Sequence, residues 1–234
     1  LPELRANLNL GMDMATGTQD IYYPKESPLG YVDNGKTGYE TIDKYNHLLD
    51  FYLQYAKDFN EKHHFDIMAG YSWQHFHRST ENAYNNLNGD NPTSYIFKTE
   101  SYLISFFGRV NYNLMDKYLL EANIRYDGSS KFPSNLQWRA FPSFSLGWRL
   151  SEEKFMDWSK TFLSSLKLRG SWGMIGDQTV SSSLYVPTIS QGQASWLDPS
   201  GNKIIYAGTP AAVDPRITWQ DIALSLIHIS EPTR

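Results

Sequence analysis

Residues 101–114 and 118–127 alternate between apolar and polar side chains with a period of two. Aromatic and aliphatic residues occupy one parity of each stretch, and Ser, Arg, Asn, Glu and Asp occupy most of the other. Successive side chains of a β-strand point to opposite sides, so this pattern predicts two strands of a sheet with one apolar and one polar face. Leu103 and Phe107 are apolar exceptions on the polar parity.

The same alternation recurs along the whole chain and predicts an all-β, antiparallel, up-and-down fold. Further strands are expected at residues 4–14, 41–57, 65–74, 143–150 and 166–174, with another beginning at Arg216. The connections at residues 58–62 and 115–117 are short, whereas residues 15–40, 78–100 and 176–215 are expected to be long loops. We therefore expect an open, curved sheet of about seven to eight strands.

Aromatic residues stand near the ends of the apolar faces, which is where a transmembrane β-barrel places its two interfacial girdles. The candidates for contact with the membrane interface are Tyr102, Tyr112, Tyr118, Tyr126, Trp148 and Trp172. A membrane-spanning strand needs only about 9–11 residues. Long connections also alternate with short ones, as in outer-membrane barrels with long outer loops and short periplasmic turns. The pattern predicts a transmembrane β-barrel in the cell outer membrane, in contact with its lipid.

Composition excludes some functions and leaves two alternatives open. The net charge of -4 gives no indication of a nucleic-acid partner, and the absence of cysteine excludes disulfides and thiolate metal sites. A soluble β-rich glycan-binding domain would require the apolar faces to pack against each other. An outer-membrane enzyme barrel would require catalytic side chains that converge at its rim. The soluble alternative gives no reason for the unequal connections or the aromatic pairs.

Several segments, in a fixed order, resemble the barrel of the SusC/RagA family of TonB-dependent outer-membrane transporters of Bacteroidetes. The resemblance is dense over about residues 45–175 and recurs at DPRITW, residues 214–219. The other segments are KHHF at 62–65, GYS at 70–72, SFFGRVNY at 105–112, DKYLL at 116–120, RYDGSSKF at 125–132, FPS at 141–143, GWRLSEEKF at 147–155 and LKLR at 166–169.

The resemblance implies a function and a set of partners. It implies TonB-dependent import of glycan or peptide oligomers, without enzymatic activity. A SusD-like surface lipoprotein would act as a lid, and the TonB-ExbB-ExbD complex would act through a plug. A barrel of this kind is expected to have about 22 strands. We expect residues 1–222 to be a partial barrel without the plug, and residues 223–234, which match nothing in the family, to be a non-native tail.

Two sets of residues are candidates for functional contacts. The polar parity of the strands predicts that one set lines the lumen: Arg109, Glu121, Arg125, Asp127, Arg149 and Arg169. These charges either contact the plug or a passing substrate, or pair across strands. The second set comprises aromatic residues of the expected outer loops, where they could contact ligand or lid: Tyr22, Tyr23, Tyr31, Tyr95, Trp196 and Tyr206.

No catalytic residue, metal site or cofactor is expected. His75 and His77 share a strand face, but a metal site would need at least a third ligand, so we interpret them as polar residues at a strand end. The sequence contains no Ser/His/Asp order, phosphate-binding loop or EF-hand spacing.

Overall fold

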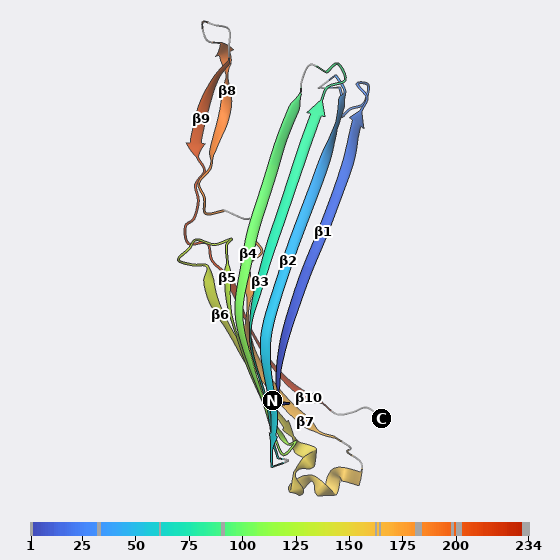
Figure 1. The fold of residues 1–234 in the computed structure, drawn as a ribbon, viewed down its shortest axis with the longest axis vertical. Coiled ribbons are helices and arrows are strands. Elements are labelled where there is room, and N and C mark those ends of the chain that lie inside the picture. The colour runs from blue at the N-terminus through green and yellow to red at the C-terminus, as the bar shows by residue number, and fades with distance from the viewer. Residues whose placement is uncertain are drawn as a thin grey trace.

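The computed structural model shows a chain made almost entirely of antiparallel strands (Figure 1). The structure describes residues 2–31, 34–60, 62–89, 92–161, 163, 165–180, 184–197, 199 and 203–230. Eight strands form one sheet in the order β1-β2-β3-β4-β5-β6-β7-β10, and β8 and β9 form a separate two-stranded sheet. The expected all-β, up-and-down architecture is confirmed.

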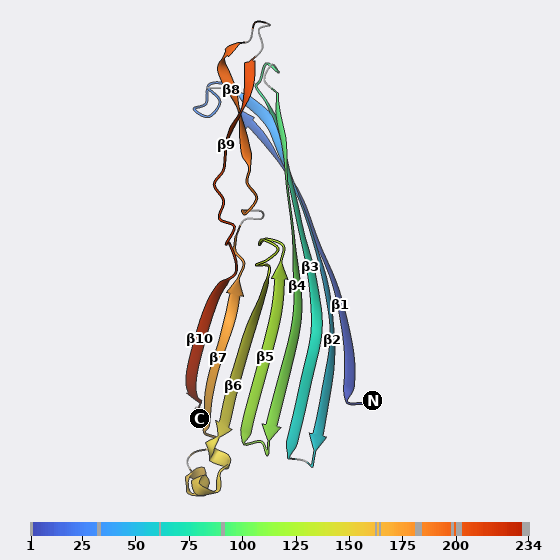
Figure 2. The same cartoon turned by 90° about the vertical axis from the view of Figure 1, so that its left-hand side faces the viewer.

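The strands differ greatly in length. The bounds are β1 Leu4–Tyr23, β2 Lys36–Phe59, β3 His63–Asn85, β4 Thr93–Leu114, β5 Tyr118–Ser129, β6 Trp138–Arg149, β7 Lys167–Asp177, β8 Ile189–Leu197, β9 Lys203–Pro210 and β10 Gln220–Ser230. Between β6 and β7 lie two 3-10 helices, η1 Leu150–Glu152 and η2 Lys154–Thr161. β1 to β4 therefore extend well beyond β5 to β7, as Figure 2 shows.

Cross-strand register gives the large sheet two distinct faces. One row of directly paired residues across β1 to β5 is Leu8, Phe51, Tyr71, Phe106 and Tyr126. The adjacent row is Asn9, Asp50, Ser72, Ser105 and Asp127. Because directly paired residues point to the same side of a sheet, the first row lies on what we call the apolar face and the second on the polar face.

The apolar face is not covered by another layer of the described protein. Leu10 is 73% exposed and Leu146 is 56% exposed. The buried hydrophobic cluster is small and consists of Phe132, Phe141 and Trp219, at the end of β5 to β7 opposite the short turns. Among the described residues, no helix combines the length and the apolar character needed to cross a membrane. The arrangement lacks the dry two-layer core that a soluble β-sandwich requires.

The expected long loops at residues 15–40 and 78–100 are wrong over most of their length. Strand pairing continues from Met14 to the Tyr23–Lys36 pair, and between β3 and β4 as far as Tyr84 and Thr93. The reason is that both faces carry polar side chains beyond the apolar band, for example at Thr16, so the period-two signal disappears while the backbone hydrogen bonds continue.

The strands turn tightly at one end of the sheet, which we call the short-turn end (Figure 1). The β4–β5 turn contains Met115 and Asp116, with φ angles of 54° and 56°. Left-handed backbone at two successive residues is typical of type I′ hairpin turns. The β8–β9 hairpin stands at the opposite end, within residues 176–215, where the sequence predicts only a loop.

Leu103 and Phe107, the apolar exceptions within residues 101–114, have local structural roles. A Cβ atom at Gly70 would lie 2.6 Å from Cζ of Phe107, so the Phe107 ring lies directly over this glycine, its cross-strand partner. Covering a strand glycine with an aromatic ring stabilises the pairing there. Leu103 packs against the buried cluster of Phe132, Phe141 and Trp219.

Strand β10 pairs with β7, but its pattern is reversed relative to the other strands. Leu224 is paired with Gly173 and Leu226 with Ser171, so both leucines lie on the polar face. Residues 231–234 lie outside the described part of the chain. The expectation that residues 223–234 are a non-native tail concerns their origin, which this pairing does not test, and it stays a prediction.

Placing a charge on the apolar face should destabilise the full-length protein in a membrane. For Ile124→Lys, in the middle of the β5 apolar face, we expect the free energy of unfolding in lipid vesicles to fall by about 2–4 kcal/mol, because the ammonium group would face lipid. Asn123→Lys, the matched control on the polar face, should change it by less than about 1 kcal/mol. Equal losses in urea titrations of the two variants would contradict the assignment of the faces.

Candidate functional site: a polar wall between aromatic bands

All six charged residues expected to line a lumen lie on the polar face. The register pairs Arg109 with Asn123, Glu121 with Asn111 and Ser145, and Asp127 with Ser105 and Arg139. Arg125 is opposite Phe107, Arg149 is opposite Lys167, and Arg169 is opposite Gly147. The structure therefore places them on one wall, although it does not bring them together at one point.

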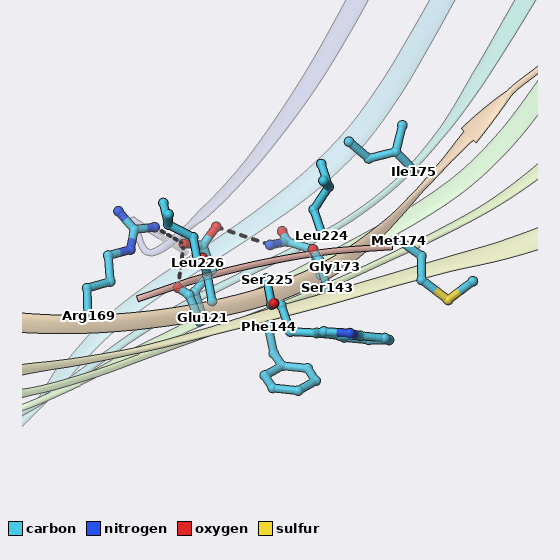
Figure 3. Close-up of a pocket in the computed structure, with 14 residues that line it drawn as sticks. Glu121, Ser143, Phe144, Arg169, Gly173, Met174, Ile175, Leu224, Ser225 and Leu226 are labelled. Atoms are coloured by element: carbon cyan, nitrogen blue, oxygen red, sulfur yellow. Dashed lines mark hydrogen bonds and ion pairs between the residues drawn. The ribbon is translucent and has the colours of Figure 1, made fainter. Parts of the chain in front are cut away.

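Glu121 and Arg169, two of the six residues, form a charged contact. Nη2 of Arg169 lies 3.8 Å from Oε2 of Glu121. The Glu121 carboxylate also accepts hydrogen bonds from Asn123 and Ser145, at 3.1 and 3.5 Å. These groups line a hollow of about 520 Å³. Figure 3 shows Glu121 and Leu226 on one side of the sheet and Phe144 on the other.

The second contact joins Arg125 to Asp127. Nη2 of Arg125 lies 3.3 Å from Oδ1 of Asp127 and donates a hydrogen bond to Oγ of Ser105 at 3.0 Å. Arg109 and Arg149 belong to neither contact. Nε of Arg109 is buried without a hydrogen-bond acceptor, and the backbone N–H of Arg149 bonds to the carbonyl of Lys117. Among the six residues, four form two charge pairs, and the Nε of Arg109 has no acceptor in the described part of the chain.

The six aromatic residues expected at a membrane interface all lie on the apolar face and contact other rings. Tyr102 stacks on His75 with ring centroids 4.5 Å apart, and Tyr126 stacks on Trp138 at 5.1 Å. Trp172 lies 5.3 Å from its cross-strand partner Phe144. These contacts form bands across neighbouring strands. Amphipathic rings in such bands suit a boundary between lipid and water.

The band at the short-turn end is held by side-chain hydrogen bonds. Nδ1 of His63 and the hydroxyl of Tyr112 are 2.8 Å apart. The Glu153 carboxylate accepts hydrogen bonds from the Tyr118 hydroxyl at 2.6 Å and from the Trp148 indole N–H at 3.2 Å. These two bonds, together with the nearby Lys117 ammonium, lower the pKa of Glu153. The carboxylate thereby links the connection after β6 to the rings of Tyr118 in β5 and Trp148 in β6.

The aromatic residues expected in outer loops lie mostly in strands, which corrects their predicted secondary structure. Tyr22 and Tyr23 end β1, Tyr95 lies in β4 and Tyr206 lies in β9; only Tyr31 lies in a turn. Trp196 is in β8, but its side chain lies outside the described part. Strand pairing reaches these positions because β1 to β4 continue past the apolar band. Tyr22, Tyr23 and Tyr95 belong to the large sheet and Tyr206 to the small one, so these residues lie in two separate sheets.

One aromatic cluster, at the end of the sheet opposite the short-turn end, is not predicted from the sequence. Nζ of Lys36 lies 3.9 Å above the ring of Tyr84, which is 6.5 Å from the ring of Tyr95. The Tyr84 hydroxyl donates a hydrogen bond to Asn82 at 2.6 Å. The sequence gives no signal for this cluster, because it is the pairing of β3 with β4 that brings Tyr84 close to Tyr95.

Histidines also gather on the apolar face, but without the geometry of a metal site. His75 is stacked on His47 with centroids 5.7 Å apart, and Nδ1 of His77 lies 3.0 Å from the Glu100 carboxylate. Among the described residues, no group of three or more His, Asp or Glu side chains is arranged to hold a metal ion. The residues instead extend the aromatic band that includes Tyr102.

The chain matches the family model described as TonB dependent receptor-like, beta-barrel, over residues 3–216. It is 34% identical to TonB-dependent receptor SusC of Bacteroides thetaiotaomicron, over 94% of this chain and 22% of that protein. It is 33% identical to TonB-dependent receptor P39 of Formosa agariphila, over 76% of this chain and 18% of that protein. The chain thus spans about a fifth of the length of these curated relatives.

Solved structures show the same fold. The structure described as the RagAB peptide transporter aligns with a TM-score of 0.79 at 17% identity, and it covers 98% of this chain and 26% of that chain. A second structure, of the RagAB peptide importer in the 'closed-closed' state, aligns with a TM-score of 0.81 at 16% identity, over 99% of this chain and 26% of that one. At this identity the likeness concerns the fold alone.

Replacing Glu153 with Gln should make stability less dependent on pH. Because the pKa of Glu153 is lowered in the folded protein, its carboxylate stabilises the fold above the ordinary glutamate pKa, and this contribution is lost as the pH falls through the lower folded value. We expect Glu153→Gln to lower the thermal unfolding temperature of the full-length protein at about pH 7 but not at about pH 3.

Glu152→Gln is the matched control, because Glu152 is the exposed neighbour of Glu153 and should leave the melting temperature unchanged at both pH values. A deficit of the same size at both pH values for the Glu153 variant would show that shape, rather than charge, matters at this position.

The contact between Glu121 and Arg169 should contribute little to stability. The two side chains are 37% and 53% exposed, so water screens their attraction. In a double-mutant cycle with Glu121→Gln and Arg169→Gln, measured by urea unfolding, we expect a coupling energy below about 1 kcal/mol. A coupling of several kcal/mol would instead make the pair a structural element of the wall.

Proposed function

Because the chain belongs to the TonB-dependent receptor-like β-barrel family, we propose that it forms part of the wall of an energy-coupled transporter that imports nutrient oligomers. The family places the chain in the outer membrane, and the matched relatives are receptors and transporters rather than enzymes. The chain contributes surfaces to this process and no bond-making chemistry.

The observation that carries the proposal is the pair of adjacent rows, one apolar and one polar, that continue unbroken across β1 to β5. In a closed barrel the apolar face contacts lipid and the polar face contacts the interior. Arg109, Glu121, Arg125, Asp127, Arg149 and Arg169 would then line the passage. Half-exposed charges such as Arg125 and Arg169 keep such a wall hydrated and able to exchange partners.

We infer that the short-turn end faces the periplasm and that the long ends of β1 to β4 stand outside the cell. This orientation follows from the rule that outer-membrane barrels have short periplasmic turns. It places the Glu153 contacts at the inner interface and the Tyr84–Tyr95 cluster above the outer one. Tyr22, Tyr23, Tyr31, Tyr95, Trp196 and Tyr206 are then candidates for contact with substrate or lid, because aromatic faces stack well on sugar rings and apolar side chains.

The substrate class that we propose is an oligomer of sugars or of amino acids. The resemblance to the SusC/RagA family implies these two classes, and the likeness of the fold to a structure named a peptide transporter supports the second. A SusD-like surface lipoprotein would cover the outer mouth. The TonB-ExbB-ExbD complex would displace a plug in the full-length protein, so that the oligomer passes along the polar wall.

Deleting the full-length gene from the bacterium that carries it tests this proposal. We expect the deletion strain to lose growth on either a defined oligosaccharide mixture or a defined peptide mixture as sole carbon source, while growth on the corresponding monomers is retained. Removal of TonB should give the same loss, because uptake depends on energy coupling. The mixture that fails identifies the substrate class. Unchanged growth of the deletion strain on both mixtures would refute the proposal.

A further inference from the structure

Strand β4 has a long edge that no strand pairs with. On one side β4 is paired with β3 from Thr93 onward, but on the other its pairing with β5 begins only at Leu103 and Ser129. Ser130 extends this contact by one residue, since its N–H donates to the carbonyl of Tyr102. Within the described part of the chain, residues 93–101 therefore form a free edge, visible above β5 in Figure 2.

This edge would persist in a complete barrel. The outer edges of β1 and β10 are free here because they lie at the two sides of the sheet, and in a closed barrel further strands pair with them. β4 and β5 are already hydrogen-bonded neighbours, so no other barrel strand can enter between them. The unpaired edge follows from the difference between β4, with 22 residues, and β5, with 12 residues.

The backbone groups presented by the edge can be assigned. Tyr102 directs both its N–H and its carbonyl toward Ser130, with distances of 2.9 and 3.0 Å to the Ser130 side chain and backbone. Because peptide groups alternate sides along a strand, those of Ser94, Ile96, Lys98 and Glu100 point the same way. These residues offer donors and acceptors at strand spacing, a repeat that a polypeptide backbone matches and that sugar hydroxyls do not.

The side chains beside this edge also favour a polypeptide. Ile96 and Phe97 are 59% and 62% exposed, and as successive strand residues they lie on opposite faces of β4. An added strand would cover apolar surface on both faces at once. Natural edge strands usually carry proline, bulges or several charges that prevent such pairing. The described edge carries two charged residues, and one of them, Glu100, is bound to His77.

We propose that the free edge of β4 is a docking site for an extended polypeptide segment, which binds by adding a strand to the sheet. The inference rests on the proposed function only in placing this edge outside the cell. The β8–β9 hairpin is the alternative occupant within the chain, since two-stranded sheets gain stability from a third strand. It is paired only with itself among the described residues.

Binding of a synthetic probe to the purified full-length receptor tests the proposal. The probe is a fluorescent nine-residue peptide of alternating Thr and Val with blocked ends, and its binding is measured by fluorescence anisotropy. The Ile96→Pro/Lys98→Pro variant removes two edge N–H groups but none that point to β3, and Ile96→Ala/Lys98→Ala is the matched control. We expect the proline variant to bind at least about tenfold more weakly than the alanine variant.

Hydrogen exchange of residues 93–101, measured on the same samples, completes the test. We expect up to four amides, those of Ser94, Ile96, Lys98 and Glu100, to exchange rapidly without peptide and to become protected when peptide is added. Equal binding by the proline and alanine variants would overturn the proposal. Protection of the four amides before peptide is added would also overturn it, because the hairpin would then occupy the edge. Both measurements use purified protein, so a failure of nutrient uptake would not change their outcome.

Discussion

The structure depends on one constraint, which is that within the apolar band each strand must satisfy its backbone hydrogen bonds through its neighbours while it keeps the same face toward the same environment. A register shift of one residue between β1 and β2 would place Asn9 rather than Leu8 beside Phe51. The apolar and polar rows are therefore a consequence of register as much as of composition. Since no second layer covers the apolar face in the described part of the chain, a dry core cannot supply the stability, so pairing and lipid contact must do so.

The sequence alone is sufficient to predict the sheet wherever one face is apolar and the other polar, as in residues 101–127. The prediction from sequence fails where the contrast between an apolar and a polar face ends. Thr16 and Thr18 in β1 have polar neighbours on both faces, so nothing in the pattern indicates that pairing continues to Tyr23. The β8–β9 hairpin is missed for the same reason. Phe107 has the wrong character for its face because it covers a glycine on the next strand, and only the register reveals that relation.

The candidate wall can likewise be predicted from the sequence only in part. Parity alone assigns Arg169 and Glu121 to one face, but their approach to 3.8 Å depends on the stagger between three strands and cannot be derived from spacing. Glu153 directly follows η1, and its bonds to Tyr118 and Trp148 require that β5 and β6 be paired first. Residues joined by long-range pairing are where sequence reasoning ends.

The unequal lengths of the strands would also determine the shape of the mouth of a barrel built from them. Four strands of 20 to 24 residues stand beside strands of 11 and 12 residues, and the β8–β9 hairpin stands at the same end as the long extensions (Figure 2), so one part of the rim is continuous sheet and another is a separate hairpin. In a barrel with the proposed orientation, a bulky molecule that arrives along the pore axis would meet the extended ends of β1 to β4 on one side of the mouth. Such an asymmetric rim would make entry oblique, and the direction of approach would be set by the strand extensions beyond the apolar band.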